Sequence, residues 1–258
     1  MILDIDQLED HKSVIGSKTK NLKVLRDLGF KVPVFIALSI SITEKLFLDE
    51  KYRNKIAGGI AEKLKSEKYA IRSSALIEDG ENQSHAGQFK TIIDVKEGNI
   101  GDAIYKVIKQ ANARLDGKLD LFSLIVQEYI EPDTSGVTFT RNPDGNREMI
   151  IEYHHGIGDE LVSGKITPQK EQFYWNEDVK TDLPIKDFKK IEESLGHPQD
   201  IEWCIKGDTF YFLQTRPITT ISADQFEEII FLEKQLKEKK YYLEKTEISE
   251  IAPRPTPI

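Results

Sequence analysis

The sequence has few of the residues from which disulfides and zinc sites are built. It contains a single cysteine, Cys204, among 258 residues. One thiol excludes an internal disulfide framework and is typical of chains that fold in a reducing compartment. No Cys/His cluster accompanies the adjacent pair His154 and His155, whose side chains would point to opposite faces of a strand. The sequence therefore predicts no zinc site in that region.

Long apolar runs and an excess of basic residues are also missing. The longest mostly apolar stretch, residues 32–42, is far too short to cross a bilayer, and residues 1–12 carry acids where a signal peptide has basic residues. The formal net charge is −8, from 36 Lys and Arg against 44 Asp and Glu, which argues against a general nucleic-acid binder. We therefore expect a soluble, cytoplasmic protein with no membrane or nucleic-acid partner.

What the chain does contain is a mixed order of helical and strand patterns. Apolar periodicity predicts helices at residues 18–28, 43–68 and 100–115, with Gly58-Gly59 as a break or hinge in the second. The first has Leu22, Leu25 and Leu28 on one face, and Gly29 is expected to end it. Strands are expected at residues 33–42, 68–75, 89–95, 121–130, 135–143, 148–156 and 200–219. Intermingled strands and helices indicate an α+β (mixed α/β) fold.

A glycine-bearing stretch at residues 156–167 departs from two familiar phosphate-binding motifs. A Walker loop needs four residues between its glycines, whereas five separate Gly158 from Gly164, and Ile166 stands where Ser or Thr is required. The dinucleotide-binding fingerprint needs a third glycine where the chain has Leu161. If the protein binds a nucleotide, it does so through another motif.

The segment 200–219 combines strand-forming residues with polar ones at regular intervals. The polar residues are Asp200, Glu202, Gln214 and Arg216. The first two share a face of their strand, and so do the last two. A two-residue turn at Gly207-Asp208 would put the two pairs on opposite faces, whereas an odd-length turn or a bulge would bring all four together.

On one face, these residues have a defined chemistry. Two carboxylates and an amide oxygen form a hard oxygen set that suits Mg²⁺, and a neighbouring arginine suits a phosphate that the metal also touches. The alternative is a solvated sheet face with a surface Arg–Asp pair. The hairpin alone leaves both interpretations open.

Several blocks of sequence occur in a particular order between residues 12 and 220. They are "IGSKTKNL", "YAIRSSALIEDGENQSHAGQF", "LIVQEYI", "SGVTFTRNP", "IIEYHHGIGDELVSGKITP" and "DIEWCIKGDTFYFLQTRPIT". In this order they closely resemble the nucleotide-binding domain of phosphoenolpyruvate synthase and pyruvate phosphate dikinase, a domain that rifampicin phosphotransferase shares. The resemblance implies a two-lobed, ATP-grasp type fold and an ATP-dependent phosphotransferase that uses Mg²⁺.

The resemblance also implies which residues would hold the phosphates of ATP. The cationic residues that hold the phosphates in the family correspond to Lys18, Arg72 and Arg216. Phosphoryl transfer needs charge neutralisation and in-line positioning, which such residues supply. Gly87 lies in a stretch that matches a lid over the phosphates. We do not expect His85 in the same stretch to accept phosphate, because the Thr-Ser-His acceptor sequence of the family is absent.

Further positions are implied for the metal and the nucleoside. Glu202 and Gln214 match magnesium ligands, Asp200 accompanies them, and Glu152 matches an acidic position of the same cleft. The residues that border adenine and ribose correspond to Gln127, Glu128 and Ile130. The stretch 16–19, Gly-Ser-Lys-Thr, departs from the family pattern, which usually has a double glycine before the lysine and a glycine after it.

The implied activity is phosphoryl donation from Mg-ATP to a histidine on a separate domain, in cis or in trans, as part of a paired-acceptor enzyme. An antibiotic phosphotransferase of the rifampicin type and a non-catalytic nucleotide-binding module stay open as alternatives. We expect an N-terminal lobe at residues 1–126 and a C-terminal lobe with the metal site at 127–220. A helical, proline-rich tail at 221–258 would lead to missing domains; the alternative is an ordinary frayed terminus.

Overall fold

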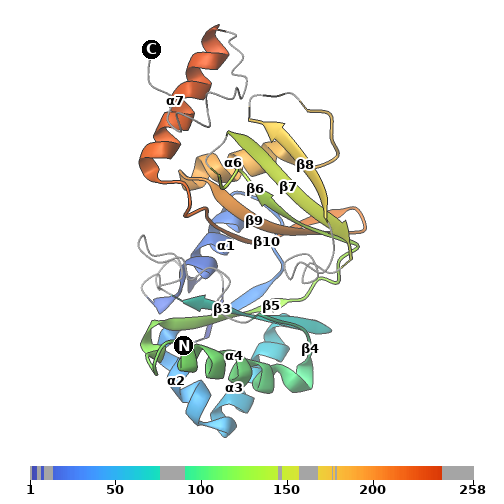
Figure 1. Ribbon diagram of the computed structural model, residues 1–258. Coiled ribbons are helices and arrows are strands. Elements are labelled where there is room, and N and C mark those ends of the chain that lie inside the picture. Colours follow the sequence, from blue (N-terminus) through green and yellow to red (C-terminus); the bar gives the residue numbers. More distant parts are fainter. Residues whose placement is uncertain are drawn as a thin grey trace.

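The computed structural model describes residues 2–4, 7–8, 14–75, 91–144, 147–156, 168–175, 177 and 179–239. In these ranges the chain forms two five-stranded sheets with helices packed around them (Figure 1). All of the described strand pairs are antiparallel. The expected α+β, two-lobed class is confirmed. The expected lid with His85 and Gly87, the stretch 157–167 and the proline-rich terminus lie outside the described residues.

The first sheet has the strand order β1-β2-β5-β3-β4. Its strands are β1 (Ile2–Asp4), β2 (Phe35–Leu38), β3 (Lys68–Ala75), β4 (Ile92–Lys96) and β5 (Phe122–Glu128). One face is covered by α2 (Ile40–Leu48), α3 (Glu50–Leu64) and α4 (Ile100–Arg114) (Figure 1). Short 3₁₀ turns at Glu97–Asn99 and Leu119–Leu121 precede α4 and β5. Ile60 and Ile104 pack from the helices with Ile71 of β3, so this half has a core of its own.

The second sheet has the strand order β10-β9-β6-β7-β8. Its strands are β6 (Thr134–Phe139), β7 (Glu148–His155), β8 (Gln169–Tyr174), β9 (Gln199–Lys206) and β10 (Thr209–Pro217). Helix α6 (Ile185–Leu195) covers one face, where Phe188 packs beside Trp203 with ring centroids 6.4 Å apart. Gly136 on β6 has to be glycine, because an added Cβ would lie 2.2 Å from the ring of Trp203.

Helix α1 (Ser17–Asp27) connects the two halves. Its apolar residues Leu22 and Leu25 are buried in a core that also contains Ile125 of the first sheet and Phe212 of the second. The helix matches the one expected from the leucine spacing, and Gly29 ends it in a left-handed conformation with φ +88°. Because one core draws on both sheets through α1, this helix determines how the sheets are held together.

The predicted break at Gly58-Gly59 is wrong. Helix α3 runs through both glycines, and the interruption comes earlier, at Asp49 between α2 and α3. A carboxylate oxygen of Asp49 accepts a hydrogen bond from the amide of Tyr52 at 2.8 Å and so caps α3. Burial of Ala57, Ile60 and Ala61 along α3 outweighs the cost of the two glycines, which is about 1 kcal/mol each relative to alanine.

The last described helix, α7 (Ala223–Lys239), follows the second sheet. Ile229 and Phe226 of this helix pack against Phe139 and Ile218 in a small separate cluster. No helix in the described ranges combines the length and the apolar character that crossing a bilayer would require.

Candidate functional site

The hairpin that carries the four polar residues has an even turn and a bulge. The turn consists of Gly207 and Asp208, so by its length alone it would separate the two polar pairs. The register shifts between Phe212 and Gln214, which makes Leu213 the extra residue of a β-bulge. Beyond the bulge all four polar residues lie on one face, which meets the condition derived from the sequence.

These residues belong to a row of directly opposite positions that continues across the second sheet. Gln214 on β10 lies opposite Glu202 on β9, Glu202 lies opposite Val137 on β6, and Val137 lies opposite Glu152 on β7. Residues directly opposite one another share a face of the sheet. Glu152 in turn lies opposite Lys170, with a carboxylate oxygen 3.7 Å from its ammonium. The acidic position at 152 is therefore on the same face as the hairpin residues.

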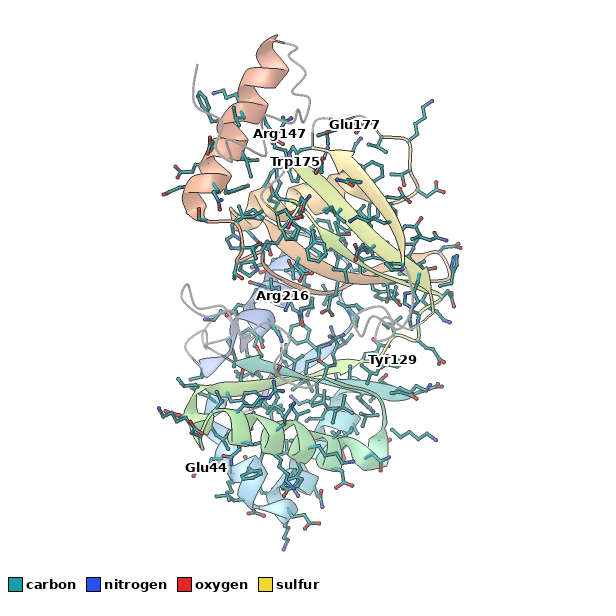
Figure 2. The ribbon with its side chains drawn as sticks, in the orientation of Figure 1. Glu44, Tyr129, Arg147, Trp175, Glu177 and Arg216 are labelled. Atoms are coloured by element: carbon teal, nitrogen blue, oxygen red, sulfur yellow. The ribbon has the colours of Figure 1, made fainter. Side chains whose placement is uncertain are left out.

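A second row places an arginine against a buried carboxylate. Arg216 lies opposite Asp200, and its Nη2 and Nε lie 2.6 and 2.7 Å from Asp200 Oδ2. Gln214 Nε2 donates to Glu202 Oε1 at 3.4 Å. Arg216 lies between the two sheets (Figure 2). The surface Arg–Asp pair considered from the sequence is thus a pair whose acid is almost buried.

The first sheet reaches this face through Arg72 on β3. Its Nη1 lies 3.2 Å from Glu202 Oε2, although 130 positions separate the two residues. Lys18, in the first turn of α1, has its Nζ 3.5 Å from Ser73 Oγ, next to Arg72 in β3. A cation of the first sheet, Arg72, and a carboxylate of the second, Glu202, therefore meet across the two sheets.

Asp200 has an unusual electrostatic environment. Burial raises the pKa of its carboxyl, the negative charge of Glu202 acts in the same direction, and Arg216 opposes both. Its second oxygen, Oδ1, is buried and has no hydrogen-bond partner among the described residues. A buried acceptor without a donor is costly, so this oxygen is poised for a ligand that is a cation or a donor.

The same face holds no reactive thiol. Cys204 is fully buried, and burial raises the pKa of its thiol to about 12, so it remains protonated and is a poor nucleophile. Among the described residues there is also no group of three or more His, Cys, Asp and Glu side chains arranged around a common metal position. A metal at this face would need the amide oxygen of Gln214 besides the two acids.

The residues expected to border adenine and ribose lie at the end of β5. Gln127 is opposite Ala70, two positions from Arg72 on β3, so it shares the face of the first sheet that carries Arg72. It is almost fully buried, and its Nε2 has no hydrogen-bond partner in the described part of the chain. Glu128 is the last residue of β5, and Ile130 lies in the segment that leads to β6. The expected lobe boundary after residue 126 falls inside this strand.

Sequence reasoning missed the contacts that hold α1. Ser74 and Ser123 bind the start of the helix, and Asn21 binds the backbone of β10. Ser74 stands in the block noted for Arg72, and Ser123 directly precedes the block noted for Gln127. No periodic pattern marks such contacts, because each joins segments that are far apart in the sequence.

Comparison with known proteins shows that most of the chain matches one protein family. Residues 50–182 and 184–237 match the family described as "Pyruvate phosphate dikinase, AMP/ATP-binding domain". The chain is 30% identical to a probable phosphoenolpyruvate synthase of Pyrococcus abyssi over 88% of this chain and 33% of that protein. It is 27% identical to the uncharacterized phosphotransferase YvkC of Bacillus subtilis (85% and 35%) and 31% identical to the rifampicin phosphotransferase of that organism (59% and 23%).

The sequence identity to solved structures is lower than the identity to these relatives. The D-alanine-D-alanine ligase of Coxiella burnetii aligns with a TM-score of 0.45 and 12% identity, over 86% of this chain and 60% of the ligase. The chain therefore spans only about a quarter to a third of the length of the three curated relatives named above: 33%, 35% and 23% in the order given. The family match covers most of the chain, including β3, β5 and all strands of the second sheet. The chain belongs to the AMP/ATP-binding domain family of pyruvate phosphate dikinase.

Proposed function

We propose that the chain binds Mg-ATP between its two sheets and donates a phosphoryl group. The observation that carries this proposal is the meeting of Arg72 from β3 with Glu202 from β9, on the face that also holds Asp200, Gln214 and Arg216. Cations and hard oxygen donors side by side are what a metal-bound polyphosphate requires.

The donor set fits magnesium. Asp200, Glu202 and Gln214 offer two carboxylates and an amide oxygen on one face, and Asp200 Oδ1 is a buried acceptor without a donor among the described residues. The metal, when bound, would neutralise phosphate charge. Arg72 and Arg216 neutralise the same carboxylates in this structure, so phosphates that attract the two guanidinium groups would leave the carboxylates to the metal.

Each remaining residue has a proposed task. Lys18 would contact the phosphates together with the two arginines, as a point charge on a flexible stem. The nucleoside would lie against β5 and the segment after it, at Gln127, Glu128 and Ile130. Gly87 would belong to the lid over the phosphates. Glu152 would extend the acidic face, with Lys170 as its present partner.

The rest of the reaction would take place outside this chain. We propose that ATP donates to a histidine on another domain, in cis or in trans, in a cytoplasmic paired-acceptor enzyme. The relatives named as probable phosphoenolpyruvate synthases support this class of enzyme. Residues 1–126 and 127–220 would be its two ATP-binding lobes, and residues 221–258 would lead to the further domains. The relatives named as rifampicin phosphotransferase support an antibiotic as an alternative second substrate.

Calorimetry with the whole chain tests whether it binds Mg-ATP. We expect ATP to bind more tightly when Mg²⁺ is present than when it is absent, and AMP to bind without that dependence. The variant Asp27→Asn, which removes an exposed ion pair with Lys23 on α1, should bind like the wild type. A chain that binds no ATP with or without Mg²⁺ contradicts the proposal.

Labelled ATP tests whether the chain donates a phosphoryl group. With the chain and a histidine-bearing domain of a relative, the proposal predicts label on that histidine. Binding without transfer to any added domain would instead favour a nucleotide-binding module without turnover.

A further inference from the structure

The first turn of α1 is bound to the first sheet by two serines. The amide of Gly16 donates to Ser123 Oγ at 3.0 Å, and the amide of Thr19 donates to Ser74 Oγ at 3.2 Å. Thr19 Oγ1 also lies 3.0 Å from Ser74 Oγ. The first amides of a helix lack partners within the helix, and here the N-cap residue is Gly16, which has no side chain to supply one. The sheet therefore caps α1.

The glycine at the start of α1 is required by this contact. A Cβ at position 16 would lie 2.0 Å from the carbonyl oxygen of Ser74 and 2.6 Å from its hydroxyl. No side chain fits such a space without moving the backbone of β3. The helix start is thus pressed directly onto β3, two positions from Arg72.

One turn later, α1 is bound to the second sheet. Asn21 Nδ2 donates to the carbonyl oxygen of Thr215 at 2.9 Å, and Thr215 stands between Gln214 and Arg216 on β10. The strand β10 is at the edge of its sheet, so its outer backbone groups need partners. Asn21 supplies one of them.

A second bond to the same edge lies beyond the end of α1. The amide of Phe212 donates to the carbonyl oxygen of Lys31 at 2.9 Å, at the residue where the bulge begins. The helix and the segment after it therefore follow the edge of β10 from the bulge to the residues around Arg216. Helix α1 thus lies beside the strand that carries Gln214 and Arg216.

Lys18 lies in the first turn of α1, close in the sequence to both attachments. It is one residue before Thr19 and three residues before Asn21, and residues three apart are neighbours on the surface of a helix. We propose that α1 is a strut, in which Ser74 and Asn21 are positioning residues that set Lys18 relative to Arg72 on one side and to Gln214 and Arg216 on the other. This inference rests on the proposed role of Lys18 at the phosphates.

A double-mutant cycle distinguishes positioning from general support. The variants are Ser74→Ala and Asn21→Leu, each made alone and together with Lys18→Met, with Asp27→Asn as the control on the same helix. Calorimetry with ATP and with AMP, both with Mg²⁺, measures affinity for each variant. Thermal unfolding measures whether each remains folded at the temperature of the titration.

The strut predicts a particular pattern. Lys18→Met should weaken ATP binding by about 10- to 100-fold, as expected for a hydrogen bond to a charged group. Ser74→Ala and Asn21→Leu should each weaken it by about 2- to 10-fold, as expected for one neutral hydrogen bond. In the Lys18→Met background neither should cause a further loss. The affinity for AMP should stay the same throughout.

Two results overturn the inference, and they are distinguishable from failure of the proposed function. Losses of the same size with and without Lys18 would show that the serine and the asparagine act independently of the lysine. Equal losses for AMP and ATP would show general damage to the site. A wild-type chain that binds no ATP would contradict the proposed function and, with it, the strut.

Discussion

Two arginine–carboxylate clusters lie at the second sheet, one between its helices and the segment after β6 and one on its strands, and they differ in what they leave unsatisfied. In one, Arg141 is fully buried and donates to both Glu192 on α6 and Glu233 on α7. In the other, the side chains of Arg216 and Glu202 retain 27% and 30% of their exposure. The charged groups of the first cluster are buried and paired with one another. The second cluster faces the first sheet.

The difference shows which kind of charged cluster is a candidate for binding. The guanidinium of Arg141 has carboxylate acceptors for all three of its nitrogens and lies 3.6 Å from the ring centroid of Trp175, a residue that lies toward α7 (Figure 2). The site cluster instead contains Asp200 Oδ1, a buried oxygen without a donor among the described residues. Arginines and acids in contact do not by themselves indicate a binding site; a buried acceptor without a donor beside partly exposed charges makes the second cluster the better candidate.

The largest expected effect is on stability, from breaking the buried cluster at its centre. Arg141→Met leaves Glu192 and Glu233 buried without their cation, which typically costs about 3–5 kcal/mol. Urea denaturation should show this loss in the free energy of unfolding. Calorimetry at low temperature, where the variant is folded, should show wild-type affinity for ATP; a loss of affinity there would mean that the two clusters are coupled.

The next effect concerns binding and comes from the other cluster. Glu202→Gln removes a charge at nearly constant shape, and affinity for Mg-ATP should fall by about 10- to 100-fold, as for loss of a charged contact. The free energy of unfolding should change by about 1 kcal/mol or less, because the side chain is partly exposed. A large loss of stability with unchanged affinity would mean that the polar face is structural.

Replacing the whole buried cluster sharpens the contrast. The triple variant Arg141→Met, Glu192→Leu, Glu233→Leu removes all three charges together, so no partner stays behind unpaired. Such replacements are often neutral or stabilising, and we expect a free energy of unfolding within about 2 kcal/mol of the wild type. If urea denaturation gave the triple variant the same deficit as Arg141→Met, packing would explain the cluster better than charge.

The smallest effect is a dependence on pH. Burial raises the pKa of Glu233, Glu192 raises it further, and Arg141 and Arg147 oppose this. A raised pKa means that the folded state holds the proton more tightly, so the free energy of unfolding falls as pH rises from 4.5 to the folded-state pKa. Glu233→Gln removes this contribution.

Urea denaturation of both proteins from about pH 4 to about pH 8 measures the effect. The difference in unfolding free energy, Glu233→Gln minus wild type, should increase with pH across the interval and then level off. A difference that decreases with pH would mean that Arg141 stabilises the carboxylate more than burial disfavours it.

Local patterns predicted the parts of the fold that depend on local interactions. The leucine spacing and Gly29 located α1, and the apolar run at 121–130 located β5. The spacing of the polar residues predicted that each pair shares a face of its strand, but whether the two pairs share the same face depended on the turn and the bulge, which the spacing left open. Gly58-Gly59 misled because burial along α3 outweighs intrinsic propensity.

Contacts between distant segments could not be predicted in this way. Arg72 meets Glu202 across 130 positions, and Arg141 meets Glu192 across 51 and Glu233 across 92. Such pairs depend on how sheets and helices are stacked, which leaves no period in the sequence. The resemblance to a family supplied Arg72 and Glu202 as site residues, but neither their ion pair nor the buried cluster.

The bulge at Leu213 has a consequence for anyone who edits or transplants this hairpin. In a hairpin with the same turn and the same residues but no bulge, Leu213 would lie opposite Glu202, and Gln214 and Arg216 would lie on the other face. A three-residue turn made of Lys206, Gly207 and Asp208 would pair Gln214 with Asp200 and so would keep the four polar residues on one face without a bulge. The portable unit is therefore the turn together with the bulge and the Lys31 carbonyl that binds beside it. A graft that copies only the four polar residues would carry the chemistry to the wrong side of the sheet.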